Sequence, residues 1–200
     1  HLSFVIKKYV SENINLVSTS DKGIYDALNF AIRSVKADII GILHAGDIFP
    51  NRKTLSEVAT VFERNKSDIV YGDLEVRRNV HQEDTLVRRW KAGFFSPYKL
   101  YLGWMPPHPT IFVKKNVFSK VGYYSEKNKI SSDYDWVIRV FKRRDIKIDY
   151  LSKTLSVMQA GGVSQTNIWK SFFEDWRITN KHKLFFAAIL KRLIKIKQLW

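Results

Sequence analysis

The sequence contains no cysteine, only 5 prolines, and far fewer acidic than basic residues. Without cysteine, disulfides, zinc–thiolate sites and thiol nucleophiles are excluded, and the chain is compatible with a reducing cytoplasm. The longest apolar run, residues 184–190, is much shorter than the roughly 20 residues that a membrane-spanning helix needs. The 19 acidic residues against 34 basic ones leave a formal net charge of +15. This imbalance favours anionic partners.

The 200 residues are 45% hydrophobic and 14% aromatic, which is typical of a folded globular chain of about one domain. The basic residues are spread along the chain, and no RNA-binding aromatic strand or Cys/His finger accompanies them. The distribution therefore argues against nucleic-acid binding. It favours a solvated basic surface or contact with an anionic membrane.

Short strand-like runs alternate with helical patterns. The spacing predicts strands over residues 14–19, 38–43, 68–74, 110–113 and 146–158, and helices over 24–36, 132–144, 169–177 and 184–199. A capping box at residues 54–57 predicts the start of a further helix, with Leu55, Val58, Ala59 and Phe62 facing inward. The run over 38–43 is almost continuously apolar, as in a strand buried on both faces. This order predicts an α/β fold: a Rossmann-type, mainly parallel sheet with helices on both faces, followed by C-terminal helices.

Carboxylates follow three of the predicted strands, at Asp21, Asp47 and Asp73. Each alone is a common turn residue or helix cap. Because ligands collect beyond the carboxyl ends of strands in such sheets, three on one rim indicate a functional site. Oxygen ligands of this kind hold Mg²⁺ or Mn²⁺ when the ion bridges a diphosphate.

Several segments resemble, in order, the motifs of family 2 glycosyltransferases of bacterial polysaccharide synthesis, which have the GT-A fold. They are DKGIYDALN at 21–29, DIIGILHAGD at 38–47, VYGD at 70–73, GWMPPHPT at 103–110, SSDYDWVIR at 131–139 and GGVS at 161–164. The resemblance implies a partial GT-A domain over residues 1–165, lacking the N-terminal segment that usually holds the nucleotide base. Residues 166–200 would form a helical, basic, amphipathic tail.

By this resemblance the chain transfers a sugar, with inversion, from a nucleotide-sugar to a bacterial surface polysaccharide or lipid-linked glycan. Such chemistry needs a base for the acceptor hydroxyl, and the resemblance assigns that role to Asp133. The alternative is a carboxylate that only complements the helix dipole. Asp135, two residues later, points to the other side of the helix, and its spacing from Ser132 suggests a structural, capping role.

The resemblance also implies ligand-binding residues. The predicted nucleotide-sugar contacts are Asp21, Lys22, Gly23, Asp26, Asn29, His44 and Asp73. The predicted ligands of Mg²⁺ or Mn²⁺ are Asp47 and His108, although the family usually has more carboxylates where this chain has only Asp47. His108 has the alternative of an ordinary hydrogen-bonded loop histidine.

Trp104 and Tyr134 are the predicted acceptor contacts. Trp104 could stack on a sugar face or anchor its loop to the core.

The last twenty residues contain six Lys or Arg and no acid, with apolar residues spaced to form one stripe. This pattern is typical of a helix lying on an anionic membrane, and the alternative is a terminal helix packed on its own domain. We therefore expect a cytoplasmic protein that is peripheral on the inner face of the cell membrane. The alternative to an enzyme is a non-catalytic basic α/β module that binds a membrane or a protein partner.

Overall fold

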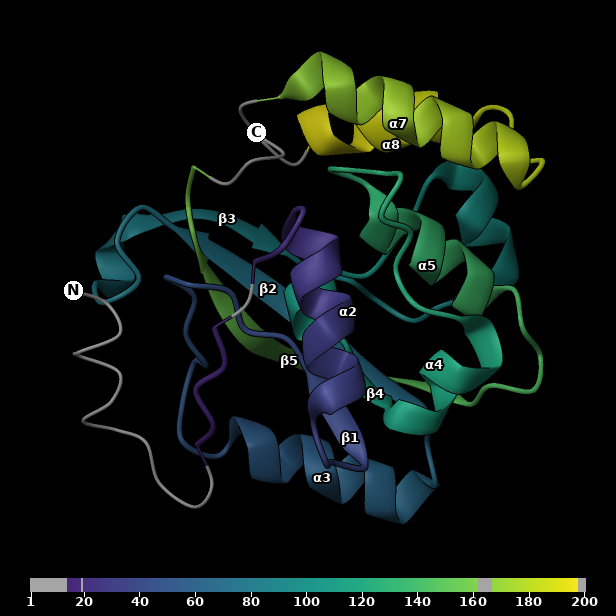
Figure 1. Ribbon diagram of the computed structural model, residues 1–200. Helices are drawn as coiled ribbons and strands as arrows, with labels where there is room; N and C mark the ends of the chain where they lie inside the picture. The colour runs from purple at the N-terminus through teal and green to yellow at the C-terminus, as the bar shows by residue number, and fades with distance from the viewer. Residues whose placement is uncertain (1–13, 19, 162–166, 198–200) are drawn as a thin grey trace.

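The computed structural model describes residues 14–18, 20–161 and 167–197, which form one mixed sheet covered by helices (Figure 1). The strands are β1 (Ile39–Gly41), β2 (Ile69–Arg77), β3 (Leu86–Trp90), β4 (Phe112–Lys114) and β5 (Ile148–Gln159). The helices are α2 (Ile24–Ser34), α3 (Thr54–Asn65), α4 (Lys115–Val121), α5 (Ser132–Phe141), α7 (Ile168–Lys181) and α8 (Ala187–Lys197). The α/β class predicted from the sequence is confirmed.

The sheet is mixed rather than mainly parallel. Its order is β1-β4-β2-β3, with β5 on the other side of β2. Only the β2–β5 pairing is parallel among the described strands, whereas β4 runs antiparallel to both β1 and β2. Strands β1 and β2 still run in the same direction, as the β-α-β pattern predicts. Strand β4, which comes later in the sequence, lies between them, and local sequence patterns cannot predict this insertion.

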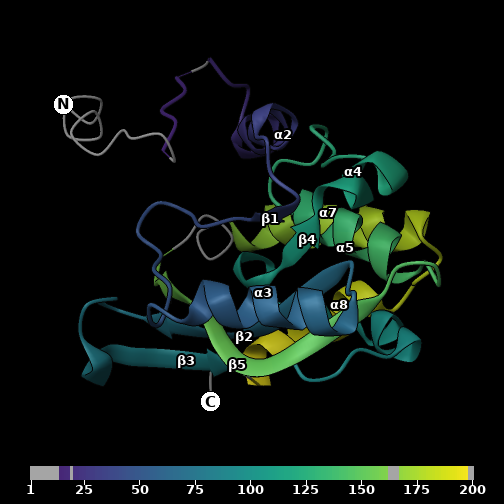
Figure 2. The same cartoon turned by 90° about the horizontal axis from the view of Figure 1, so that it is seen from below.

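Alternate residues of β2 face opposite sides of the sheet and enter different clusters. Ile69 and Tyr71 pack with side chains of α2, α4 and α5, whereas Val70 packs with Val58 and Phe62 of α3. Figure 2 shows α3 lying along the sheet on the side away from α2. The continuous apolar run of β2 is therefore explained by burial on both faces, as predicted.

Three local predictions need correction. Of the described residues 14–18, only Ile14 makes a β-bridge, so the predicted strand is not formed there. Strand β1 is short and buries only Ile40, because among the described strands it pairs with β4 alone. The apolar spacing of α2 predicts Ile24, Leu28 and Ile32 on one inward face, but the helix buries Tyr25, Asn29 and Ile32 and leaves Ile24 exposed.

Some predicted segments extend beyond the residues that the structure describes. Positions 162–164 of the GGVS motif and residues 198 and 199 of the last predicted helix lie outside the described residues. The domain division at residue 165 stays a prediction.

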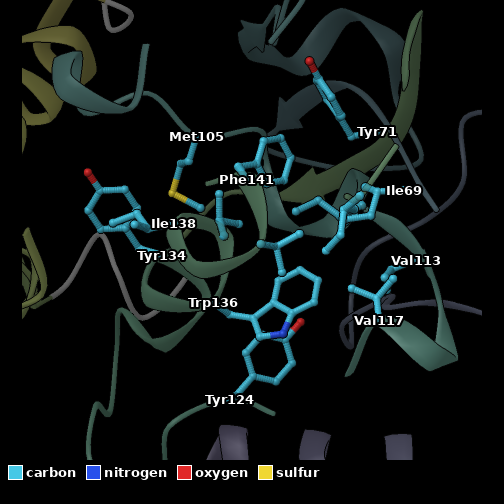
Figure 3. Packing of buried hydrophobic residues seen from close by; sticks show 14 of the residues in the cluster. Ile69, Tyr71, Met105, Val113, Val117, Tyr124, Tyr134, Trp136, Ile138 and Phe141 are labelled. Atoms are coloured by element: carbon cyan, nitrogen blue, oxygen red, sulfur yellow. The ribbon is translucent and has the colours of Figure 1, made fainter. Parts of the chain in front are cut away.

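Helix α5 is the centre of the larger core. Trp136, fully buried, stacks on Phe118 at 5.0 Å between ring centres and donates its indole N–H to the carbonyl of Gly122 at 3.0 Å. Figure 3 shows Trp136 beside Tyr124, with Ile138 and Phe141 further along the same helix. Because nearly all its side chains are buried, α5 is rigidly placed, and so is its first turn at the edge of the core.

The C-terminal helices cover one end of the domain. Helix α7 lies over α5, and α8 runs beside α7 and packs on the turn Pro97–Leu102 (Figure 1). Gly103 follows this turn with φ +75°, and a Cβ there would lie 2.1 Å from the carbonyl oxygen of Ala187. Only glycine therefore allows α8 to pack this closely.

Candidate active site

The carboxylate of Asp133 lies half-buried in the first turn of α5. Its Oδ1 accepts hydrogen bonds from the Tyr25 hydroxyl at 3.1 Å and from the backbone N–H of Tyr134 at 2.9 Å. Burial and the charge of Asp133 raise the pKa of Tyr25 far above its usual range, so Tyr25 stays a donor. The same hydroxyl lies 2.7 Å from the carbonyl oxygen of Ile130. Helix α2 thus orients the carboxylate from 108 residues away.

The loop before Asp133 is held by Glu174 of α7. The Glu174 carboxylate accepts the backbone N–H groups of Lys129, Ile130 and Ser131 at 3.0, 2.9 and 2.9 Å. Glu174 is buried, so these charge-assisted bonds are shielded from water. Glu174 could not be identified from the sequence, because nothing in an amphipathic helix indicates that one of its acidic residues has partners more than 40 residues away.

His108 lies near the carboxylate of Asp133. It is buried, and its Nε2 is 2.9 Å from the Tyr124 hydroxyl. Burial lowers the pKa of His108, which outweighs the opposite influence of the Asp133 charge, so the imidazole is neutral at pH 7. The ring centre of His44 is 6.0 Å from that of His108. The structure thus favours the hydrogen-bonded alternative for His108.

Asp47 follows β1 in a turn near His44. Its Oδ1 accepts the backbone N–H of Gln159 at 3.2 Å, while Oδ2 is buried without a hydrogen-bond partner among the described residues. Burial raises the pKa of Asp47. A buried oxygen of this kind fits a cation ligand. The described residues contain no group of three or more His, Asp or Glu side chains that could hold a metal, so a bound ion would need further ligands from a diphosphate and water.

The start of α2 forms a compact turn. Asp21 accepts the backbone N–H of Gly23 at 3.1 Å, and Asp26 accepts that of Lys22 at 2.9 Å. Residues 22–26 line a hollow of about 110 Å³ together with residues 126, 128 and 129. The structure therefore brings these four predicted nucleotide-sugar residues together. It places two lysines, Lys22 and Lys129, at the same hollow.

Two predicted ligand contacts have structural partners instead. Asn29 is buried and exchanges hydrogen bonds with the backbone of Tyr124, at 2.9 and 3.0 Å, which clamps α2 to its neighbouring loop. Asp73 is not at the end of its strand, because β2 continues to Arg77. Its Oδ1 accepts the Ala92 N–H at 2.8 Å and the Tyr150 hydroxyl at 2.7 Å, so Asp73 fastens the sheet to the next loop.

The predicted acceptor residues also lie inside. Tyr134 is fully buried, with the Lys191 ammonium 3.5 Å from its ring centre, so the prediction that it contacts an acceptor is wrong. Trp104 donates its indole N–H to the Ala92 carbonyl at 2.9 Å and stacks on Phe95 at 5.5 Å. This is the loop anchor that the sequence left as an alternative.

Asp135 is structural, as predicted, but for another reason. Its buried carboxylate pairs with Arg139 and His182 at 2.9 Å each and with Lys181 at 3.2 Å, joining α5 to the end of α7. Burial alone would raise the pKa of Asp135, but the His182 hydrogen bond and the charges of Arg139 and Lys181 hold it well below its usual range. The carboxylate serves an ion-pair cluster rather than a helix cap.

Comparison with known proteins gives the family. Residues 2–143 match the model of glycosyl transferase family 2. Proteins of Mycobacterium bovis and Mycobacterium tuberculosis, named PGL/p-HBAD biosynthesis glycosyltransferases, are 26% identical over 185 residues, covering 92% of this chain and 69% of theirs.

The fold also matches solved structures. S. aureus TarS 1-349 in complex with UDP-GlcNAc aligns over 94% of this chain with a TM-score of 0.61 and 14% identity. The chain spans 54% of that protein and 31% of the longer TarS chain, for which the TM-score is 0.58. The sequence motifs, the sheet with its covering helices and these matches agree: the chain belongs to glycosyl transferase family 2, and its fold is GT-A.

Proposed function

We propose that this chain transfers a sugar from a nucleotide-sugar donor to a glycan or lipid-linked acceptor of a bacterial surface polysaccharide, with inversion. One observation carries the proposal: the half-exposed carboxylate of Asp133 is fixed at the start of a rigid helix by Tyr25. The names of the mycobacterial relatives and the nucleotide-sugar in the S. aureus complex support a reaction of this class.

Asp133 would act as the general base. Its carboxylate would accept the proton of the acceptor hydroxyl while the oxygen of that hydroxyl bonds to the anomeric carbon. The bond from this carbon to the diphosphate oxygen breaks on the opposite face, which inverts the configuration. The imidazole of His108 is neutral, so it forms no ion pair with Asp133, and the Asp133 carboxylate can accept that proton.

The leaving diphosphate needs positive charge. Lys22 and Lys129 supply it at the hollow beside α2. A Mg²⁺ or Mn²⁺ ion held by Asp47 through Oδ2, which has no hydrogen-bond partner in the described part of the chain, would neutralise further diphosphate charge when bound.

The test compares Asp133→Asn with Asp145→Asn, a surface carboxylate paired only with Arg143 among the described residues. Release of nucleoside diphosphate is measured with a panel of nucleotide-sugars and with acceptor extracts. Turnover of Asp133→Asn should fall by about 10²–10⁴, with donor affinity nearly unchanged, because only the base is lost. Asp145→Asn should match the wild type.

Two outcomes would contradict the proposal. Turnover of Asp133→Asn within tenfold of the wild type would remove Asp133 as the base. A wild-type protein that binds donors or partners but turns over none of the panel would favour the non-catalytic basic module.

A further inference from the structure

The outward face of α7 is aromatic. Trp169 and Phe173 are 75% and 65% exposed, and Trp176 lies one turn further on the same side. The face that packs on the domain is the opposite one, which carries Asp175 and Ile178. Aromatic side chains of this size at successive turns of an outward face mark a surface that binds something.

A second apolar stripe lies beside the first. Phe186 is 72% exposed in the turn before α8, and Ile189 and Leu193 are exposed along the helix, whereas Ala187 and Lys191 face the domain. Helices α7 and α8 run side by side over one end of the domain (Figure 1). They are joined where the Arg192 guanidinium donates to the carbonyl oxygen of Ile168. The two stripes therefore form one surface, which we call the α7–α8 face: Trp169, Phe173, Trp176, Phe186, Ile189 and Leu193.

The charge around the α7–α8 face has one sign. Among the side chains described from 167 to 193, the only acids are Glu174 and Asp175. Both are buried, Glu174 against three backbone N–H groups and Asp175 against Lys191 at 2.9 Å. Basic side chains such as Lys170 and Lys183 are exposed. The surface thus presents aromatic and aliphatic groups among cations, with no opposing exposed acid in this part of the chain.

We propose that the α7–α8 face docks on an anionic lipid bilayer. Tryptophan and phenylalanine partition into the boundary between headgroups and acyl chains, while lysine and arginine bind the anionic headgroups. A second copy fits less well, because pairing two such faces would bring their cations together. No helix of the described residues is long and apolar enough to span a membrane. The sequence predicts a membrane helix only over 181–200, and the structure extends the surface to α7.

Docking would also act on the candidate active site. Glu174, on the inner face of α7, holds the loop that leads to Asp133. Helix α7 therefore carries lipid-facing groups on one side and the support of the catalytic loop on the other. This arrangement would place the loop near a lipid-linked acceptor. Docking itself does not depend on the proposed reaction.

The test is co-sedimentation of the full chain with vesicles of phosphatidylcholine alone or with about a quarter phosphatidylglycerol. Binding should require phosphatidylglycerol and weaken about tenfold or more when salt is raised from about 50 to 500 mM. The double variant Trp169→Ser/Phe173→Ser should lose about tenfold or more in affinity, because both side chains leave water only on docking. Its matched control is Phe30→Ser/Phe94→Ser, two exposed aromatics outside α7, α8 and the turn on which α8 packs, which should bind like the wild type.

A second pair of variants tests the role of the basic side chains. Lys170→Glu/Lys183→Glu should weaken binding to the anionic vesicles, whereas Lys36→Glu/Lys66→Glu, elsewhere on the surface, should do so by less than about threefold. Circular dichroism checks that each variant is folded. Absence of binding at low salt would overturn the proposal. So would equal losses in the target and control variants, or a dimer in sedimentation velocity that only the α7–α8 variants abolish.

Discussion

Replacing Glu174 by alanine removes the carboxylate that accepts the N–H groups of Lys129, Ile130 and Ser131. A hydrogen bond to a charged group contributes about 1.5–3 kcal/mol, and a buried donor left without a partner costs about 1–3 kcal/mol. Water entering the space left by the side chain will recover part of this. We therefore expect Glu174→Ala to lower the free energy of unfolding by about 3–5 kcal/mol. For a chain of this size, that corresponds to a fall in Tm of about 6–20 °C.

Glu174→Gln separates the carboxylate's charge from its shape. The amide oxygen can still accept from Ile130 and Ser131, but the amide nitrogen would meet the N–H of Lys129, a second donor. The expected loss is about 1–2 kcal/mol. Glu57→Ala is the matched control, because Glu57 makes an exposed pair with Lys153 at 2.7 Å and should contribute less than about 1 kcal/mol.

Urea unfolding followed by circular dichroism measures all three variants. Turnover should fall with Glu174→Ala even where the protein remains folded, because the loop before Asp133 loses its support. If Glu174→Ala lies within 1 kcal/mol of the wild type, comparable to the control, then Glu174 does not hold the loop and the reasoning fails.

Three further predictions concern stability and metal binding. The pKa of Asp135 lies below its ordinary value of 3.8 because the His182 hydrogen bond and neighbouring cations outweigh burial, so its contribution to stability is present above about pH 4 and is lost as the pH falls further. In urea unfolding, Asp135→Asn should therefore cost about 3–5 kcal/mol at pH 7, and the difference should shrink below pH 4; a difference that does not depend on pH would contradict this. Gly103→Ala should cost about 2–4 kcal/mol because its Cβ would meet α8, against about 1 kcal/mol for Gly93→Ala, which has φ +68° and whose Cβ would meet only the Lys99 Nζ at 3.9 Å; equal costs would refute the close packing. If Asp47 is a metal ligand, we expect Mn²⁺ to raise the Tm of the wild type in the presence of UDP and Asp47→Asn to abolish that rise; an equal rise in both proteins would remove Asp47 as a ligand.

Those parts of the fold that depend on local patterns were predictable. The continuous apolar run of β2 and the start of α3 at Thr54 lie where the sequence places them. Of the residues predicted to face inward from α3, Val58 and Phe62 are buried, whereas Leu55 is exposed. The insertion of β4 between β1 and β2 was not predictable, because strand direction depends on pairing between distant segments. The inward face of α2 was missed for a similar reason: Tyr25 and Asn29 are buried because their polar atoms meet partners about 100 residues away.

The candidate site likewise contains residues that the sequence singled out and residues that it misplaced. Asp133 was singled out through its motif, and Asp26 lines the hollow at the start of α2, with Asp21 in the adjoining turn; their roles stay predictions. Asp73 was misplaced because strand β2 runs three residues beyond its predicted end at residue 74. Tyr134 was misassigned because proximity in sequence to Asp133 does not determine which side of α5 a residue faces.

The central position of β2 has a consequence for the synthesis of the protein. Strand β2 ends at residue 77, but its parallel partner β5 begins only at residue 148. At about 5–20 residues per second, a ribosome needs about 4–14 s to make the chain between them. During that interval Val70 and Tyr71, fully buried in the finished fold, have no β5 to cover them. The nascent chain therefore presents an apolar strand for seconds, and chaperone supply and translation rate should set the yield of folded protein.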